Sequence, residues 1–278
     1  ISFTHLVNIR PLITHSWLAW GVLIGFVSIL LIVGNIVYYN KKRVEIDIKI
    51  DKPLARPLRI VAISDLHLGY GIKKDELEGW IGLINAENPD IVLIAGDVVD
   101  NFAKPLFEDK VYKTLRRIKA RYGVYMALGN HEYIGGEIDR NLNFLSQANV
   151  HVLRDSATLI DNTFYIIGRD DASRKYRNSL ANITDRLDHT KPMIVLDHQP
   201  SGFEEAQKCG IDLLLSGHTH GGQVFPISLV VRAIFKHSYG YHTANGTHFY
   251  ITSGLGIWGG KFRIGSRSEY VVINLQGR

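Results

Sequence analysis

Residues 58–67 read LRIVAISDLH, and residues 91–100 read IVLIAGDVVD. Each stretch is a short, continuous apolar run that ends in charged side chains, and such a run predicts a strand buried on both faces. Apolar residues at helical spacing lie between the two runs: Leu77, Trp80, Ile81 and Ile84. Buried strands that alternate with amphipathic helices predict parallel pairing in an α/β fold.

The same alternation extends along the rest of the chain. We expect strands at residues 59–64, 91–95, 123–128, 193–196, 212–215, 248–251 and 270–274. A second helix is predicted from apolar residues at helical spacing, Phe107, Val111, Leu115 and Ile118, with Gly123 as its stop signal. Residues 150–168 are typical of a hairpin around Asp161-Asn162. Together these elements predict a two-sheet α-β-β-α sandwich of mixed strand direction.

Residues 17–39, WLAWGVLIGFVSILLIVGNIVYY, contain no charged side chain. About 20 apolar residues in a helix cross a bilayer core. Aromatic residues stand at both ends, as interfacial belts would place them: Trp17, Trp20, Tyr38 and Tyr39. A soluble core helix rarely runs this long without a charge, and a signal peptide has a shorter apolar segment with positive charge before it. We therefore expect a transmembrane helix.

The basic residues predict the orientation of this helix. Lys41-Lys42-Arg43 follow the span, whereas Arg10 alone shortly precedes it. The positive-inside rule then predicts a membrane protein, at least single-pass, with its C-terminal domain in the cytoplasm. Because the first residue is isoleucine, we expect the chain to begin downstream of the native start, and further upstream spans could decide the orientation instead.

The expected organisation is a flank at residues 1–16, the transmembrane helix at 17–39, a connector at 40–57 and the main domain at 58–278. Alternation over residues 44–50 predicts an edge strand in the connector. Cys209 is the one cysteine, which excludes an intramolecular disulfide and a cysteine metal cluster. The net charge of +5 comes without a basic block interleaved with aromatics, so no nucleic acid is expected as a partner.

Five clusters rich in Asp, His and Asn each follow the end of an apolar run. They are DLH at 65–67, GDVVD at 96–100, GNHE at 129–132, DH at 197–198 and GHTH at 217–220. Any one cluster is equally compatible with turn residues after a strand. Together they would converge, because ligands bind at the carboxyl ends of strands in open α/β sheets. Carboxylate, imidazole and amide ligands suit two divalent transition metals.

In this order the clusters resemble the signature of the calcineurin-like metallophosphoesterases, over about residues 58–278 and with no departure at a metal-ligand position. The strings SDLH at 64–67, SGHTHGGQ at 216–223 and GLG at 254–256 resemble the bacterial membrane- or envelope-associated branch related to the YkuE and YaeI phosphodiesterases. The resemblance implies that 58–278 is a catalytic domain with two metals. Its implied ligands are Asp65, His67 and His220 for one metal, Asn130, His198 and His218 for the other, and Asp97 as the bridge.

The resemblance further implies that His131, beside the ligand Asn130, is the general acid, and that Asp100 orients it. A loop cap is the alternative interpretation of Asp100, and the role of Glu132 stays open. Two divalent ions are the expected cofactors; manganese is expected first, and iron and zinc also fit these ligands.

The implied function is a membrane-anchored, metal-dependent phosphoric ester hydrolase. It would cleave a phosphodiester or pyrophosphate bond by attack of a metal-bound hydroxide. The membrane span favours a lipid-linked phosphate ester as substrate, for which UDP-diacylglucosamine is one example. The alternatives are a phosphomonoesterase, a nucleotide phosphodiesterase and a catalytically dead, membrane-tethered binding protein.

Two further stretches carry weaker signals. GLGIWG at 254–259 matches a dinucleotide fingerprint, but no helical period follows it. We expect a loop over the metal site there and no nucleotide cofactor. The polar run at 169–177 is either a solvated loop or a binding site for the non-reacting part of an anionic substrate.

Overall fold

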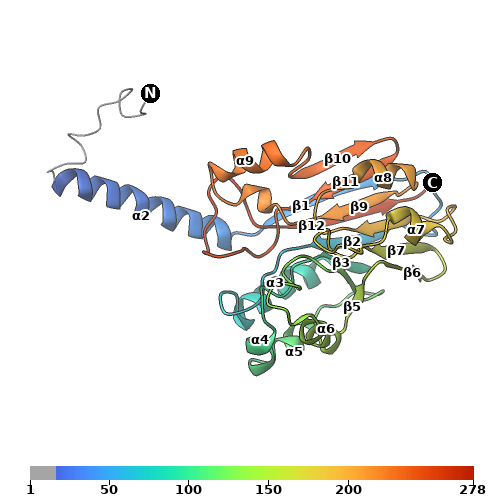
Figure 1. The fold of residues 1–278 in the computed structure, drawn as a ribbon, viewed down its shortest axis with the longest axis horizontal. Helices are drawn as coiled ribbons and strands as arrows, with labels where there is room; N and C mark the ends of the chain where they lie inside the picture. The colour runs from blue at the N-terminus through green and yellow to red at the C-terminus, as the bar shows by residue number, and fades with distance from the viewer. Residues whose placement is uncertain (1–16) are drawn as a thin grey trace.

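The computed structural model describes residues 17–278, so the flank at 1–16, with Arg10, lies outside the described residues. Helix α2 (Trp17–Tyr39) is one continuous helix that projects away from the rest of the molecule (Figure 1). Only 6% of its most apolar 18-residue window is buried. The helix therefore does not pack as the core helix of a soluble domain does.

The first sheet has six strands in the order β1-β12-β2-β3-β4-β5. They are β1 (Lys42–Lys49), β2 (Leu58–Ile63), β3 (Ile91–Ala95), β4 (Val124–Ala127), β5 (Val150–Leu153) and β12 (Glu269–Gln276). Strands β2 to β5 are parallel. The strand–helix alternation predicts this for β2, β3 and β4. Strand β12 runs antiparallel to β2 and parallel to β1. The connector therefore supplies the edge strand that its alternation predicts.

The second sheet has six strands in the order β10-β11-β9-β8-β7-β6. They are β6 (Ser156–Ile160), β7 (Phe164–Gly168), β8 (Met193–Leu196), β9 (Leu213–Ser216), β10 (Gly240–Ala244) and β11 (Thr247–Ile251). Parallel strands form the centre, and an antiparallel hairpin forms each edge. The predicted hairpin around Asp161-Asn162 is confirmed, because β6 and β7 pair antiparallel on either side of residues 161–163. Asp161 and Asn162 both have the positive φ that tight hairpin turns use.

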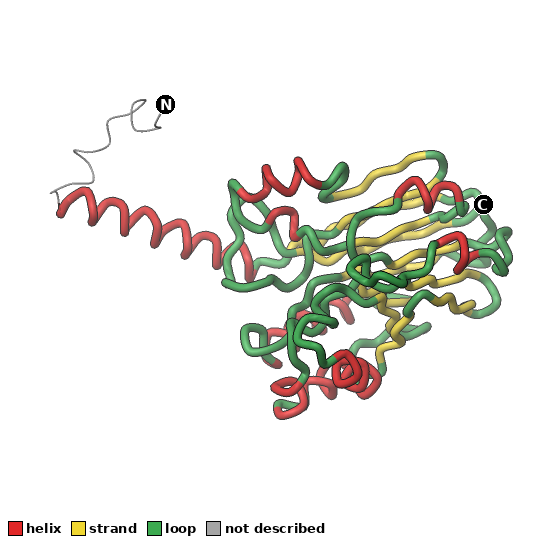
Figure 2. The backbone as a smooth tube through the Cα atoms, viewed as in Figure 1, coloured by secondary structure: helices red, strands yellow, loops and turns green. Residues whose placement is uncertain are grey.

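Helices cover the outer faces of both sheets, and the strands occupy the middle of the molecule (Figure 2). On the first sheet lie α3 (Lys74–Ala86), α4 (Lys104–Glu108), α5 (Val111–Leu115) and α6 (Ile138–Gln147). On the second lie α7 (Leu180–Thr184) and α8 (Phe203–Lys208), while the short η2 (His220–Gly222) and α9 (Ile227–Ile234) follow β9. The predicted α-β-β-α sandwich is confirmed.

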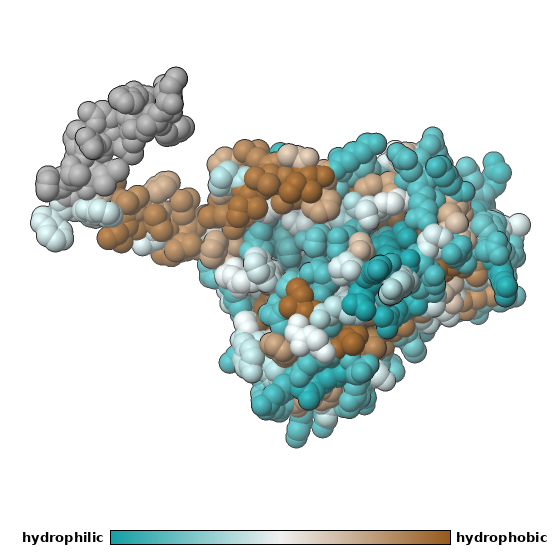
Figure 3. Space-filling model, viewed as in Figure 1, coloured by the Kyte–Doolittle hydropathy of each residue, from teal (hydrophilic) through white to brown (hydrophobic). Residues whose placement is uncertain are grey.

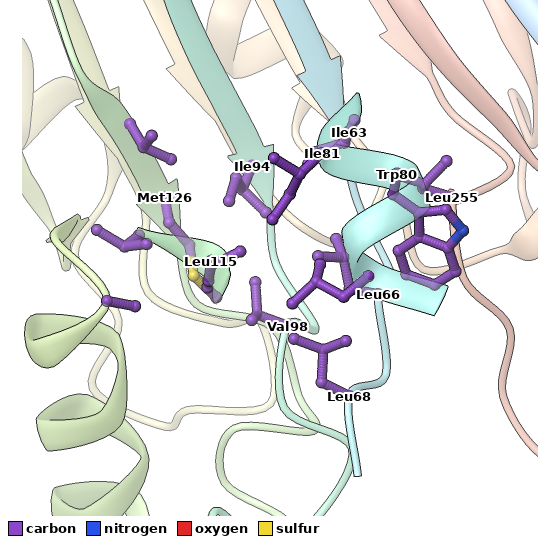
Figure 4. Packing of buried hydrophobic residues seen from close by; sticks show 14 of the residues in the cluster. Ile63, Leu66, Leu68, Trp80, Ile81, Ile94, Val98, Leu115, Met126 and Leu255 are labelled. Atoms are coloured by element: carbon purple, nitrogen blue, oxygen red, sulfur yellow. The ribbon is translucent and has the colours of Figure 1, made fainter. Parts of the chain in front are cut away.

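Alternate residues of the central strands face different layers of the core. Val92 and Ile94 of β3 belong to the cluster beneath the helices, whereas Leu93 belongs to the cluster between the sheets. Figure 4 shows Ile94 and Met126 from the strands near Leu115 of α5. Because both faces of the strands are buried, the apolar runs of the sequence are continuous.

Several predicted elements differ from the observed ones. The single helix expected from Phe107 to Ile118 is wrong: Lys110 adopts a left-handed backbone, φ 53°, and separates α4 from α5. Gly123, at φ 87°, leads into β4 and ends no helix. Strand β5 pairs with β4 in the first sheet and is not part of the hairpin predicted over 150–168. Helices α6 to α9 and strand β10 were not predicted.

The C-terminal end of α2 is fixed to the rest of the chain. The Asn35 side-chain amide donates a hydrogen bond of 2.7 Å to the Lys261 carbonyl oxygen. The Arg263 amide donates one of 2.9 Å to the Gly34 carbonyl oxygen, and the Tyr38 hydroxyl donates to Glu76 on α3. The N-terminal part of α2 is thus the part that projects.

Candidate metal centre

The predicted site residues come from five loops, each at the carboxyl end of a strand. Asp65 and His67 follow β2, Asp97 and Asp100 follow β3, Asn130 and His131 follow β4, His198 follows β8, and His218 and His220 follow β9. Strands β2 to β4 belong to the first sheet and β8 and β9 to the second. The loops of both sheets therefore meet at one rim.

Asp65, His67 and His220 form one group that could hold a metal ion. The His220 Nε2 atom lies 3.5 Å from Asp65 Oδ1 and 3.3 Å from His67 Nε2. Burial would raise the pKa of Asp65, but the neighbouring imidazoles of His220 and His198 hold it below its usual value. A carboxylate and two imidazoles that converge in this way are suitable ligands for a divalent transition metal.

Asp97, His198 and His218 form a second such group. The His198 Nδ1 atom donates to the Ala95 carbonyl oxygen at 2.7 Å, which leaves Nε2 with its lone pair. That Nε2 lies 3.1 Å from Asp97 Oδ2, and the same oxygen lies 3.8 Å from His67 Nε2. The Asp97 carboxylate thus stands between the two groups, where a bridging ligand would have to be.

Asn130 supplies an independent indication of a cation. Its side-chain oxygen is buried and has no hydrogen-bond partner. A buried, unpaired acceptor costs about 1–3 kcal/mol, and a bound cation would remove that cost. The residues present therefore fit the predicted pair of metal ions, and their assignment to individual ions stays a prediction.

The backbone of the loops is locally strained. Five of the predicted ligands have a left-handed φ between 46° and 68°: Asp65, His67, Asp97, His218 and His220. Such residues are uncommon outside glycine, and they persist only where the surrounding structure fixes them. Gly129 allows the Asp97 carboxylate to lie close to the backbone of the next loop, because a Cβ atom at residue 129 would collide with it.

Glu132 is a buried residue whose role the sequence left open. Its carboxylate accepts four backbone hydrogen bonds of 2.7–3.0 Å, from Asp97, Val98, Val99 and Gly129. Burial and the neighbouring Asp97 charge raise the pKa of Glu132 to about 7. Glu132 therefore ties the loop of Asp97 to the loop of Asn130.

His131 and Asp100 lie together, as the sequence predicts. The His131 Nδ1 atom lies 2.5 Å from the Asp100 carbonyl oxygen and 3.3 Å from its carboxylate. A carbonyl oxygen only accepts, so Nδ1 carries a hydrogen and Nε2 is the nitrogen free to exchange a proton. Burial lowers the pKa of His131, but Asp100 and Asp97 outweigh it and raise the pKa to about 8. The Asp100 carboxylate also lies 3.3 Å from His67 Nδ1.

The same geometry also allows a ligand role for His131, because His131 groups with His67 and Asp97 as possible metal ligands. The two roles predict different metal contents for a His131 variant: a general acid can be removed without loss of metal, whereas a ligand cannot.

The polar run at 169–177 is only partly solvated. Arg169 is buried and its Nη1 atom lies 3.2 Å from the buried carboxylate of Asp197, to which Arg177 also binds. These two guanidinium groups fix the loop that carries His198. Lys175 and Tyr176 remain exposed. The sequence could not show this pairing, because Asp197 lies 28 residues from Arg169.

The segment after β11 is a loop over Asp65, as predicted. The Gly256 amide donates to the Asp65 carbonyl oxygen at 3.0 Å, and the Leu255 amide donates to Ser64 at 3.0 Å. Residues 252–268 contain no helix, so the dinucleotide pattern lacks the helix it requires.

Comparisons with known proteins agree with this geometry. The model of the calcineurin-like phosphoesterase family matches residues 58–222. An uncharacterized metallophosphoesterase of Campylobacter jejuni is 35% identical over 240 residues, which are 84% of this chain and 63% of that protein. A Danio rerio "transmembrane protein with metallophosphoesterase domain" is 31% identical over 252 residues, 84% and 57% of the respective chains. YkuE of Bacillus subtilis is 28% identical over 229 residues, 78% and 79% of the chains.

The chain therefore belongs to the calcineurin-like phosphoesterase family, whose members use a dinuclear metal site. It spans about 63% of the length of the Campylobacter jejuni relative.

Proposed function

We propose that this protein is a membrane-anchored, metal-dependent hydrolase of phosphodiester or pyrophosphate bonds. The observation that carries the proposal is the convergence of Asp65, His67, Asp97, His198, His218 and His220 at one rim. The buried, unpaired side-chain oxygen of Asn130 in the loop after β4 supports it. Manganese is the expected ion. Two bound divalent ions would neutralise charge on the phosphate oxygens. They would also lower the pKa of a bound water enough for it to ionise near neutral pH.

The chain's own residues supply the remaining chemistry. Asp97 holds its carboxylate between the two ligand groups and accepts a hydrogen bond of 2.9 Å from the His131 amide. Asp100 fixes the His131 ring through Nδ1, which leaves Nε2 to donate a proton to the departing oxygen. Glu132 fixes the loop of Asp97, and the Arg169–Asp197 pair fixes the loop of His198.

Membrane anchoring is supported by the exposed, uncharged α2 and by a second apolar element. Helix α9 exposes Ile227, Leu229, Val230 and Ile234, each more than half accessible to solvent. Figure 3 shows this apolar surface on the same side of the molecule as α2. The Danio rerio relative also bears a transmembrane name. A bilayer next to the metal site favours a lipid-linked phosphate ester as substrate.

The test is metal content and turnover of the full chain in detergent. We expect about two transition-metal ions per chain and metal-dependent hydrolysis of bis(p-nitrophenyl) phosphate. Lipid-linked pyrophosphates, nucleotide diesters and phosphomonoesters are then compared as substrates. Preference for a monoester would contradict the diester assignment, and absence of any metal-stimulated turnover would contradict the enzymatic proposal itself.

A further inference from the structure

A cavity of about 490 Å³ lies between α2, α9 and the loop before β12. One wall is apolar and comes from α2, through Val33 and Val37. The charged side chains in its lining are all basic: Lys42, Arg232, Arg263 and Arg267. None of the predicted metal ligands lines it, so the cavity is separate from the metal site.

The basic side chains of this cavity have no close carboxylate partner, although the charges of Asp65 and Glu269 act on Arg263 from a greater distance. Within residues 17–278, none of the four forms an ion pair with a carboxylate. Arg263 is 1% exposed, and its Nη atoms donate to the carbonyl oxygens of His220, Ser253 and Gly256. Its Nε atom is buried without a partner. Like charges around one cavity repel, so an anion there would be stabilised.

The surroundings of the cavity indicate which kind of anion fits. Its apolar wall belongs to the uncharged helix α2, and its other side is flanked by the apolar, exposed α9 (Figure 3). A free inorganic anion gains no binding energy from an apolar wall. A lipid would place its acyl chains along α2 and its headgroup among the basic side chains. Basic pockets beside membrane helices recognise anionic headgroups in this way.

We propose that this cavity binds the headgroup of an anionic phospholipid as a non-catalytic lipid site. The proposal rests on the membrane anchoring proposed above and not on the phosphoesterase activity. Arg263 would connect the two sites, because it contacts the cavity and also holds the carbonyl oxygen of the predicted ligand His220.

Native mass spectrometry of the detergent-solubilised full chain tests the proposal, with dioleoyl phosphatidylglycerol and dioleoyl phosphatidylcholine as probes. Arg232 and Arg267 are exposed, so the double variant Arg232→Gln/Arg267→Gln should fold. At about 1 kcal/mol for each basic residue, it should bind phosphatidylglycerol about 30-fold more weakly. The matched control is Arg186→Gln/Lys208→Gln, which removes two exposed charges elsewhere and should bind like the wild type. Val37→Trp, which fills the apolar wall, should also weaken binding.

Several outcomes would overturn the proposal. Equal retention of phosphatidylcholine and phosphatidylglycerol would show that the cavity does not recognise the charge of the headgroup. Unchanged phosphatidylglycerol binding in the double variant would show the same. Competition by inorganic phosphate as effective as that by the lipid would make the cavity a simple anion site. Carbonate extraction of membranes reports anchoring separately, and turnover of bis(p-nitrophenyl) phosphate by the same variants reports the metal site. Failure of the membrane anchoring or of the phosphoesterase activity can therefore be distinguished from failure of the lipid site.

Discussion

The His131 ring is held by Asp100 through Nδ1, and this geometry separates a general acid from a metal ligand by experiment. If His131 is the acid, His131→Ala should keep both metals and lose about 10²–10⁴-fold in turnover of an alkyl phosphodiester. The loss should be smaller for an aryl ester, whose leaving group needs little protonation. Metal analysis and kcat for both esters measure this.

Asp97→Ala is the matched comparison for His131→Ala. Asp97 lies between both ligand groups, so its removal should release at least one metal and abolish turnover of alkyl and aryl esters alike. Loss of metal from His131→Ala, or an equal slowing of both esters, would identify His131 as a ligand or as a clamp on the phosphate.

Lys41 should make stability depend on pH. Its side chain is 4% exposed, and its Nζ atom lies 3.5 Å from the centre of the Tyr38 ring. Burial lowers the pKa of Lys41 to about 7, and Arg263 and Lys261 add to this while Glu76 opposes it. Between pH 7 and about 10.5, Lys41 is mostly protonated in the unfolded state and mostly neutral in the folded state, so the unfolded state binds one proton more. Stability should therefore rise with pH across that window, by up to about 2 kcal/mol from pH 7 to pH 9.

Melting temperatures in detergent at pH 7 and pH 9 measure the Lys41 effect. Lys41→Met should lose this gain, whereas Lys49→Met, which removes an exposed lysine of β1, should keep it. An identical pH response in both variants would show that Lys41 is not the group responsible.

Helix α2 is positioned by its contact with the loop at 261–264. A Cβ atom at Gly34 would lie 3.1 Å from the Phe262 Cβ and 3.2 Å from the Arg263 carbonyl oxygen. Gly34→Leu should push this loop away and cost about 1–3 kcal/mol, as overpacking usually does. Because Arg263 holds the His220 carbonyl oxygen, metal retention should fall as well.

The control for this prediction is Gly25→Leu, in the same helix. A Cβ atom at Gly25 has no neighbour within 4 Å, so the change should be neutral or slightly stabilising, since leucine favours a helix over glycine. Melting temperature and metal content compare the two variants. Equal effects would mean that α2 does not pack against the loop as described.

Sequence patterns predicted the elements that are buried on both faces better than the peripheral ones. The runs that form β3 and β8 were located to the residue, because a strand buried on both faces is a continuous apolar run. The sequence predicts one helix in place of α4 and α5, because the apolar spacing continues across Lys110. The helical backbone is interrupted there by the left-handed φ of Lys110. Short elements such as α7 carry too few residues for a periodic signal.

The convergence of the five clusters could be predicted because each follows a strand end, where topology brings the loops together. The roles of the individual ligands come from the family resemblance and stay predictions. Glu132 and Asp197 were not assigned roles, because their partners lie in other loops and only the folded chain shows them. The strain at Asp65 and His218 was equally invisible, since neither residue type requires a left-handed backbone.

The exposed apolar surfaces of α2 and α9 lie on one side of the molecule, so the membrane anchoring proposed above would place residues 58–278 against a bilayer. The orientation expected for such a span rests on Lys41-Lys42-Arg43, which follow α2; in the folded chain Lys41 is buried and Arg43 pairs with Glu87, so the positive-inside rule would apply to these residues before folding. These residues predict a cytoplasmic domain.

Cysteine labelling can test this orientation with little background. Cys209 is the one cysteine of the chain and is 9% exposed, whereas Tyr176 is 86% exposed. Tyr176→Cys should therefore react with a membrane-impermeant maleimide only after cells are permeabilised, and the unsubstituted chain should stay nearly unlabelled in both conditions. Protease treatment of intact cells should likewise leave the domain whole. Labelling of Tyr176→Cys in intact cells, together with loss of the domain to protease, would place the metal site outside the cytoplasm. The anionic lipid of the α2–α9 cavity would then have to come from the opposite leaflet.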